Sequence, residues 1–188
     1  MPPLEQFRSL PEPPADTPCG STVLARLVDG LAFRYRWATH GLDREDLRFR
    51  PCDDAMTLDE LLDHLRYLAR WMHTNVRAAK LSHDPVPYPE CCAGLADPAG
   101  DPDVLIHQTL SALADLRADI LDLGEEGLTR VVLIGGREPT AFPVWNLING
   151  PLSDALTHVG QVTSWRRILG KPVPKHDVFR GRPPVSGE

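Results

Sequence analysis

Residues 57–81 read TLDELLDHLRYLARWMHTNVRAAKL, and this stretch decides the fold class. Thr57 followed three positions later by Glu60 is a capping box, in which each side chain satisfies a free backbone N–H at the start of a helix. From Leu58 to Val76, apolar residues recur at intervals of three and four. That spacing puts them on one side of a helix. The stretch therefore predicts a long amphipathic helix that ends just before a proline-rich loop.

Three other segments have the same periodicity. Apolar residues at helical spacing predict helices over residues 21–40, from Asp101 to Gly124, and over residues 152–169. Asp101 can cap its helix, and Pro102 suits the first helical turn. We expect a further turn over residues 144–149, kinked where a glycine and a proline follow it.

A short β-branched run lies before the last helix. The residues from Val131 to Ile134 precede the pair Gly135-Gly136, which is typical of a small hairpin or an extended crossover. Four amphipathic helices with one longer connection predict an all-α fold, a four-helix bundle with a crossover or hairpin before the final helix.

Proline marks the ends of the domain. Prolines cluster in residues 1–20, in residues 82–103 and after residue 170, and proline disrupts helix interiors. We therefore expect a proline-rich N-terminal arm over 1–20, one bundle domain over 21–170, and a basic proline-rich tail over 171–188. The tail is expected to form a strap packed along the bundle.

Composition excludes several classes of function. The formal net charge of −6 argues against binding to nucleic acid, which calls for a basic face. No run of about 18 apolar residues predicts a membrane span, and the N-terminus does not have the pattern of a secretory signal. The four cysteines include no CxxC pair, so we expect reduced thiols and a cytoplasmic location.

The candidate chemistry lies on two helices. Asp154 and His158 are four residues apart, so both lie on the same side of their helix and can bind one ion. His64 lies at the shoulder of the apolar face of the 57–81 helix and can supply a third ligand. Two histidines and a carboxylate leave coordination positions open for water or substrate, which is typical of catalytic metal sites.

The helix faces that carry the candidate ligands also carry residues that could line a pocket. Trp71 lies on the same side of its helix as His64, and Gln161 and Trp165 lie on the same side as Asp154 and His158. We expect these three residues to line a pocket beside the ion. The alternative is that the two tryptophans are core residues and that His64 lies at the edge of the apolar face without binding a metal. We interpret the remaining histidines as solvated or locally hydrogen-bonded residues: His40, His73, His83, His107 and His176.

The chain resembles the DinB/YfiT-like family over the whole predicted bundle, residues 20–170, and two segments carry the resemblance. Residues 57–65, TLDELLDHL, resemble the start of the second helix of that family, where the histidine is a metal ligand. Residues 154–162, DALTHVGQV, resemble its fourth helix, where two histidines four residues apart precede a Gly-Gln pair. His64 and His158 match histidine ligand positions, whereas Asp154 replaces the first histidine of that pair.

The resemblance implies a metal-dependent S-transferase acting in detoxification or stress response. Its cofactors would be a divalent metal, zinc or nickel first and manganese second, and a low-molecular-weight thiol such as bacillithiol or mycothiol. Its partners would be that thiol or an electrophile, and the protein would be a homodimer. Two alternatives remain open: a metal-dependent hydrolase with Asp63 or Glu60 as general base, and a non-catalytic dimeric binding protein with a vestigial site.

Overall fold

The computed structural model describes residues 2–81, 83, 100–134 and 140–184. Their elements, in chain order, are α1 (Pro3–Gln6), α2 (Gly20–Ala38), the 3-10 helix η1 (Asp46–Arg48), α3 (Leu58–Lys80), α4 (Pro102–Gly127), β1 (Val131–Ile134), β2 (Thr140–Pro143), the 3-10 helix η3 (Val144–Ile148) and α5 (Pro151–Ile168).

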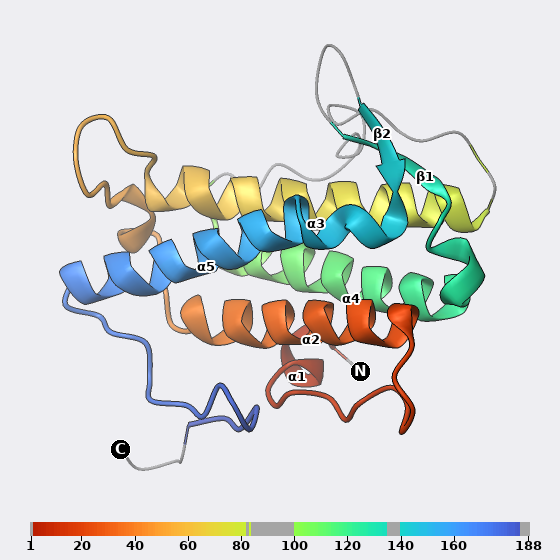
Figure 1. Cartoon of the computed structure of the whole chain (residues 1–188). Helices are drawn as coiled ribbons and strands as arrows, with labels where there is room; N and C mark the ends of the chain where they lie inside the picture. Colours follow the sequence, from red (N-terminus) through yellow and green to blue (C-terminus); the bar gives the residue numbers. More distant parts are fainter. Residues whose placement is uncertain (1, 82, 84–99, 135–139, 185–188) are drawn as a thin grey trace.

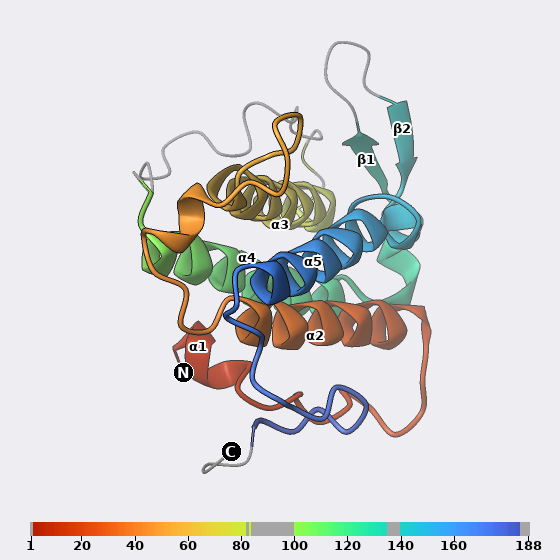
Figure 2. The ribbon, with the colours of Figure 1, turned by 90° about the vertical axis from the view of Figure 1, so that its left-hand side faces the viewer.

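The four long helices form a bundle around one apolar core (Figures 1 and 2). Helix α4 packs against both α2 and α3, and α5 packs against the same two helices from the other side. Going around the bundle, the order is therefore α2, α4, α3, α5. Each helix contributes fully buried aliphatic side chains, among them Leu24, Leu62, Leu110 and Leu152. The prediction of a four-helix bundle with a hairpin before the last helix is confirmed.

Local sequence signals set the helix ends. The Thr57 hydroxyl accepts a hydrogen bond from the Glu60 backbone N–H at 3.2 Å, and the Glu60 carboxylate accepts one from the Thr57 backbone N–H at 2.6 Å. The capping box thus forms as predicted at the start of α3. The predicted end of α4 is displaced. At Gly124 the backbone has a φ of 68°, which favours glycine, and the chain then resumes a turn that reaches Gly127.

The β-branched run forms half of a two-stranded antiparallel hairpin. Val131 pairs with Pro143, and Ile134 pairs with Thr140. The predicted Gly135-Gly136 turn lies outside the described residues. The hairpin leads through η3 into α5, so the kinked turn expected over residues 144–149 is present as a 3-10 helix.

Both terminal arms lie on the α2 side of the bundle (Figures 1 and 2). The N-terminal arm contains the one-turn helix α1, which the sequence analysis did not predict, and Phe7 beside it is fully buried. The backbone N–H of Leu10 donates to the carbonyl of Gly181 at 2.8 Å, and this bond joins the two arms. The His176 ring of the tail stacks on Trp37 of α2. The tail is thus held against the bundle over these residues.

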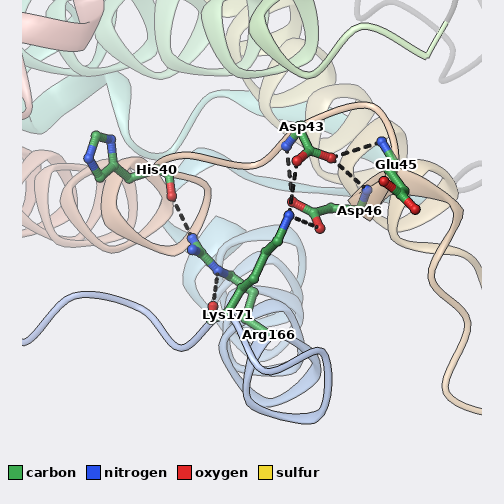
Figure 3. A network of polar contacts seen from close by, with 6 residues as sticks. All are labelled: His40, Asp43, Glu45, Asp46, Arg166 and Lys171. Atoms are coloured by element: carbon green, nitrogen blue, oxygen red, sulfur yellow. Dashed lines mark hydrogen bonds and ion pairs between the residues drawn. The ribbon is translucent and has the colours of Figure 1, made fainter.

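A polar network fixes the end of α5 (Figure 3). The buried Arg166 guanidinium donates to the backbone carbonyls of Ala38 and His40 at 2.9 and 2.8 Å. Lys171, just beyond α5, lies 2.9 Å from the carboxylate of Asp43 and 2.7 Å from that of Asp46. Together these contacts join the C-terminal end of α5 to the loop after α2.

Candidate metal centre

His64 of α3 faces Asp154 and His158 of α5. His64 Nε2 lies 3.3 Å from Asp154 Oδ2, and His158 Nε2 lies 3.4 Å from Asp154 Oδ1. The two imidazole rings are 4.8 Å apart between centroids and nearly perpendicular. Ligand atoms of all three side chains lie within 4.8 Å of one another, and among the described residues this is the one cluster with that property.

Helix packing explains why the three side chains lie close together. Asp154 and His158 are one helical turn apart, and α5 packs against α3. Behind them, the neighbouring Ala155 and Val159 are buried in the core, which fixes the rotation of α5 about its axis. The three candidate ligands therefore sit at the rim of the core, where a helix shoulder meets its neighbour.

The donor set fits a divalent ion such as zinc. Two ligand atoms that are each about 2.0–2.1 Å from one tetrahedral ion lie about 3.3 Å from each other. The two nitrogen–oxygen separations in the cluster, 3.3 and 3.4 Å, are near that value, and each involves a different oxygen of Asp154. Imidazole and carboxylate ligands suit zinc, nickel and manganese, so the set does not choose between them.

The cluster is open on one side. The side chain of Asp154 is 48% exposed, that of His64 is 29% exposed and that of His158 is 17% exposed. A site with three protein ligands and a solvent-facing side can accept a further ligand, which is the arrangement of catalytic rather than structural zinc sites.

Gln161 positions His158. Its side-chain oxygen Oε1 lies 2.6 Å from His158 Nδ1. An amide oxygen only accepts hydrogen bonds, so Nδ1 carries the hydrogen and the lone pair of Nε2 is directed towards Asp154. A metal-binding histidine needs this second partner to fix its tautomer and orientation. Gln161, predicted as a pocket residue, thus contacts a candidate ligand directly.

The two predicted tryptophans differ in their surroundings. Trp165 is half-buried and its ring packs edge-on against Phe49 at 6.3 Å between centroids. Trp71 is only 2% exposed, and its buried indole Nε1 has no hydrogen-bond partner among the described residues. The tryptophan assignment to a ligand pocket stays a prediction.

The interpretation of His73 as a solvated or hydrogen-bonded residue is wrong. His73 is 5% exposed at the α3–α4 interface, and its Nε2 lies 3.3 Å from Asp119 Oδ2 without forming a hydrogen bond. Burial lowers the pKa of His73, and the attraction of Asp115 and Asp119 only partly offsets this effect. The signal in the sequence was its position beside Met72 and Val76, on the edge of the apolar face.

The other four histidines agree with expectation. His40, His83 and His107 are exposed, and the half-buried His176 forms a local hydrogen bond with the Pro174 carbonyl. Of the cysteines, Cys19 and Cys52 are exposed free thiols. Cys91 and Cys92 lie outside the described residues.

The comparisons with known proteins bear on the fold. No protein-family model matches the sequence, and no curated protein is a significant match. Among solved structures, the fold is similar to that of a mycothiol-dependent maleylpyruvate isomerase, with a TM-score of 0.58 and 16% sequence identity. The match covers 78% of this chain and 61% of that chain, which is less than two thirds of that enzyme. At this identity the likeness shows the fold, which is the DinB-like helical fold that the resemblance implied.

Within the described part of the chain, none of the helices combines the length and hydropathy needed to cross a bilayer.

Proposed function

We propose that the chain is a divalent-metal-dependent S-transferase that uses a low-molecular-weight thiol to modify an electrophile. The observation that carries the proposal is the convergence of His64, Asp154 and His158, whose ligand atoms lie within 4.8 Å of one another. The fold supports the choice of a thiol, because the similar solved structure is a mycothiol-dependent enzyme. Mycothiol is therefore the first thiol to test, and bacillithiol the second.

Each residue has a distinct part in this proposal. His64, Asp154 and His158 would hold the ion, and Gln161 would keep the Nε2 lone pair of His158 directed at it. A bound divalent ion supplies Lewis acidity, which keeps a coordinated thiol in its nucleophilic thiolate form at neutral pH. The open side of the cluster leaves room for the thiol and its electrophile. Because Asp154 stands in place of a histidine, the site has one more negative charge, which lowers the Lewis acidity of a bound ion.

The hydrolase alternative depends on a general base, for which the sequence analysis offered Asp63 or Glu60. The Glu60 carboxylate is held by the backbone N–H and hydroxyl of Thr57, and the backbone contact is the largest cause of its lowered pKa. The Asp63 carboxylate accepts from the Arg66 guanidinium at 2.8 Å. Both carboxylates therefore already accept hydrogen bonds from protein donors, which weakens the case for either as a general base.

The test is thiol-dependent turnover with a model electrophile. Zinc- or nickel-loaded protein is mixed with mycothiol or bacillithiol and 1-chloro-2,4-dinitrobenzene. The thiolate sulfur forms a bond to the ring carbon, and chloride leaves. We expect turnover that requires both metal and thiol and falls to background in His158→Ala. Turnover that persists in His158→Ala refutes the proposal, as does its absence with both metals and both thiols.

A non-catalytic binding protein is the alternative if metal binds but turnover is absent. Homodimer formation and a cytoplasmic location also remain proposals. Sedimentation of the full chain measures the first of these directly.

A further inference from the structure

A groove lies on the opposite side of α5 from the candidate metal centre. It has a volume of about 560 Å³ and lies between α2, α5 and the C-terminal tail, and we call it the tail groove. Leu156, Gly160 and Thr163 line it from α5, at spacings of four and three that put them on one helix face. Asp154 and His158 lie on the face that meets α3, so the two sites share a helix but no residue.

The α5 wall of the groove has a gap in its side chains at Gly160. Gly160 has no side chain, and a Cβ placed on it would meet no atom of the other described residues within 4 Å, apart from its chain neighbours and the backbone of its own helix. Leu156 and Val159 give this wall an apolar character, and Val173 and Val178 do the same from the tail. A hollow of this volume is within the range of small-molecule sites, which are about 300–1,000 Å³.

The charge of the groove is opposite to that of the chain. Four of its lining residues are basic or can become so: Arg34, Arg167, Lys175 and His176. None of its lining residues is acidic, although the whole chain has a formal net charge of −6. Among the described residues, no carboxylate forms an ion pair with Arg167 or Lys175, and both side chains are exposed. Their charges are therefore available to an anion.

Contacts within the tail and with α2 hold the tail wall in place. His176 Nδ1 lies 2.8 Å from the Pro174 carbonyl and donates a hydrogen bond to it. The same ring stacks on Trp37 at 6.1 Å and meets Phe33 edge-on at 5.7 Å. The groove thus has a preformed wall on both sides, as small-molecule sites usually do.

We propose that the tail groove binds a small organic anion with an apolar body, such as a medium-chain carboxylate. The apolar walls would bury the hydrocarbon, and the basic side chains at the rim would pair with the carboxylate. The ligand would contact α2, α5 and the tail together, so binding would stabilise the docked tail. This inference does not depend on metal binding, because it uses none of the candidate ligands.

The first test is calorimetric titration of the full chain with decanoate, below its micelle-forming concentration. We expect saturable binding of one decanoate per chain and a rise in melting temperature with ligand concentration. Decyltrimethylammonium, which has the same chain and the opposite charge, should not bind. Equal binding of the two ligands would overturn the proposal, and so would the absence of saturable decanoate binding.

Two variants locate the site. Gly160→Leu fills the groove, and leucine is a better helix former than glycine, so the variant should fold and melt no lower than the parent. Arg167→Gln removes one rim charge. We expect each to weaken decanoate binding by about tenfold or more, because a charge-assisted hydrogen bond or the apolar space is lost.

Arg77→Gln is the matched control, because Arg77 is an exposed arginine on α3 and outside the groove. It changes the net charge equally and should leave decanoate affinity unchanged. His158→Ala should also bind decanoate normally, which separates this site from the metal centre. Unchanged binding in both Gly160→Leu and Arg167→Gln would refute the proposed location. Binding only to phosphatidylglycerol vesicles, with none to decanoate, would assign the groove to a membrane surface and refute a small-molecule site.

Discussion

At the scale of single residues, the hydrogen bond between His158 and Gln161 has the most direct consequence for metal binding. Replacing Gln161 with leucine removes the acceptor that holds the Nδ1 hydrogen of His158. The ring can then rotate or change tautomer, and loss of such a partner typically lowers metal affinity by about 10–100-fold. Competition with a chromophoric zinc chelator measures the affinity of Gln161→Leu against the parent.

Thr157→Ala is the control for that comparison. Thr157 is exposed on the same helix, and its hydroxyl donates to the Ser153 carbonyl rather than to a candidate ligand. Its zinc affinity should equal that of the parent. Equal zinc affinity in Gln161→Leu and the parent would show that Gln161 does not position His158.

His73 predicts how stability depends on pH. The folded-state pKa of its imidazole lies below the usual value of about 6.5 because the side chain is buried. As the pH drops below about 6.5, the imidazole of His73 binds a proton more readily in the unfolded chain than in the folded chain. The free energy of unfolding therefore falls with decreasing pH. The charged groups that act on it are Asp115 and Asp119 from α4, and Arg70 and Arg77 from α3.

Urea unfolding of His73→Leu between pH 8 and pH 5 measures this effect. The variant should lose less stability over that interval than the parent, whereas His107→Leu, at an exposed position, should follow the parent. If His73→Leu and the parent have the same pH dependence, His73 does not contribute to it.

At the scale of elements, the capping box at the start of α3 is a local feature with a measurable effect. Thr57→Ala removes the hydroxyl that accepts from the Glu60 backbone N–H. Loss of such a cap costs about 1 kcal/mol of stability. Urea unfolding should show this loss in Thr57→Ala and almost none in Thr57→Ser, which keeps a hydroxyl. Equal stability of the alanine variant and the parent would contradict the assignment.

The helices were predictable from the sequence because their signals are local. Apolar spacing and caps act within a few residues, so α3 and the hairpin strand were found where the structure has them. The short helix α1 was missed, because four residues give no periodicity. His73 was misassigned for another reason: what buries it is α4, more than thirty residues away, and Asp119 is brought to it only by packing.

The candidate site was predictable only in part. The one-turn spacing of Asp154 and His158 is local and visible in the sequence, but the approach of His64 depends on how α3 packs against α5. The shoulder position of His64 made it a candidate third ligand, and the family resemblance supported the same pairing. Gln161 was predicted only as a pocket residue. Its hydrogen bond with His158 depends on the rotamers of both side chains, which the spacing of residues in the sequence does not specify.

At the scale of the whole molecule, Arg166 joins parts that are far apart in sequence. Its guanidinium donates to the carbonyls of His40 and Lys171 (Figure 3) and to that of Ala38, so it ties α2 to the end of α5. Arg166→Leu leaves three carbonyls without this donor. Since hydrogen bonds to a charged group contribute about 1.5–3 kcal/mol each, we expect a loss of about 3 kcal/mol or more in urea unfolding.

The neighbouring Arg167 is the matched control for stability. Arg167 is exposed, so Arg167→Leu should change the free energy of unfolding by less than about 0.5 kcal/mol. Equal losses in the two variants would mean that the effect arises from removing positive charge rather than from the buried contacts of Arg166.

Elemental analysis of protein purified without chelators tests whether the bundle holds one divalent ion between α3 and α5. The protein and its His158→Ala, Asp154→Ala and His107→Ala variants are each reconstituted with zinc, nickel or manganese and then desalted. We predict close to one ion per chain in the parent and in His107→Ala, and loss of the ion in the other two variants. Parent protein that binds none of the three metals, or binding that survives in both His158→Ala and Asp154→Ala, would contradict a metal ion at this site.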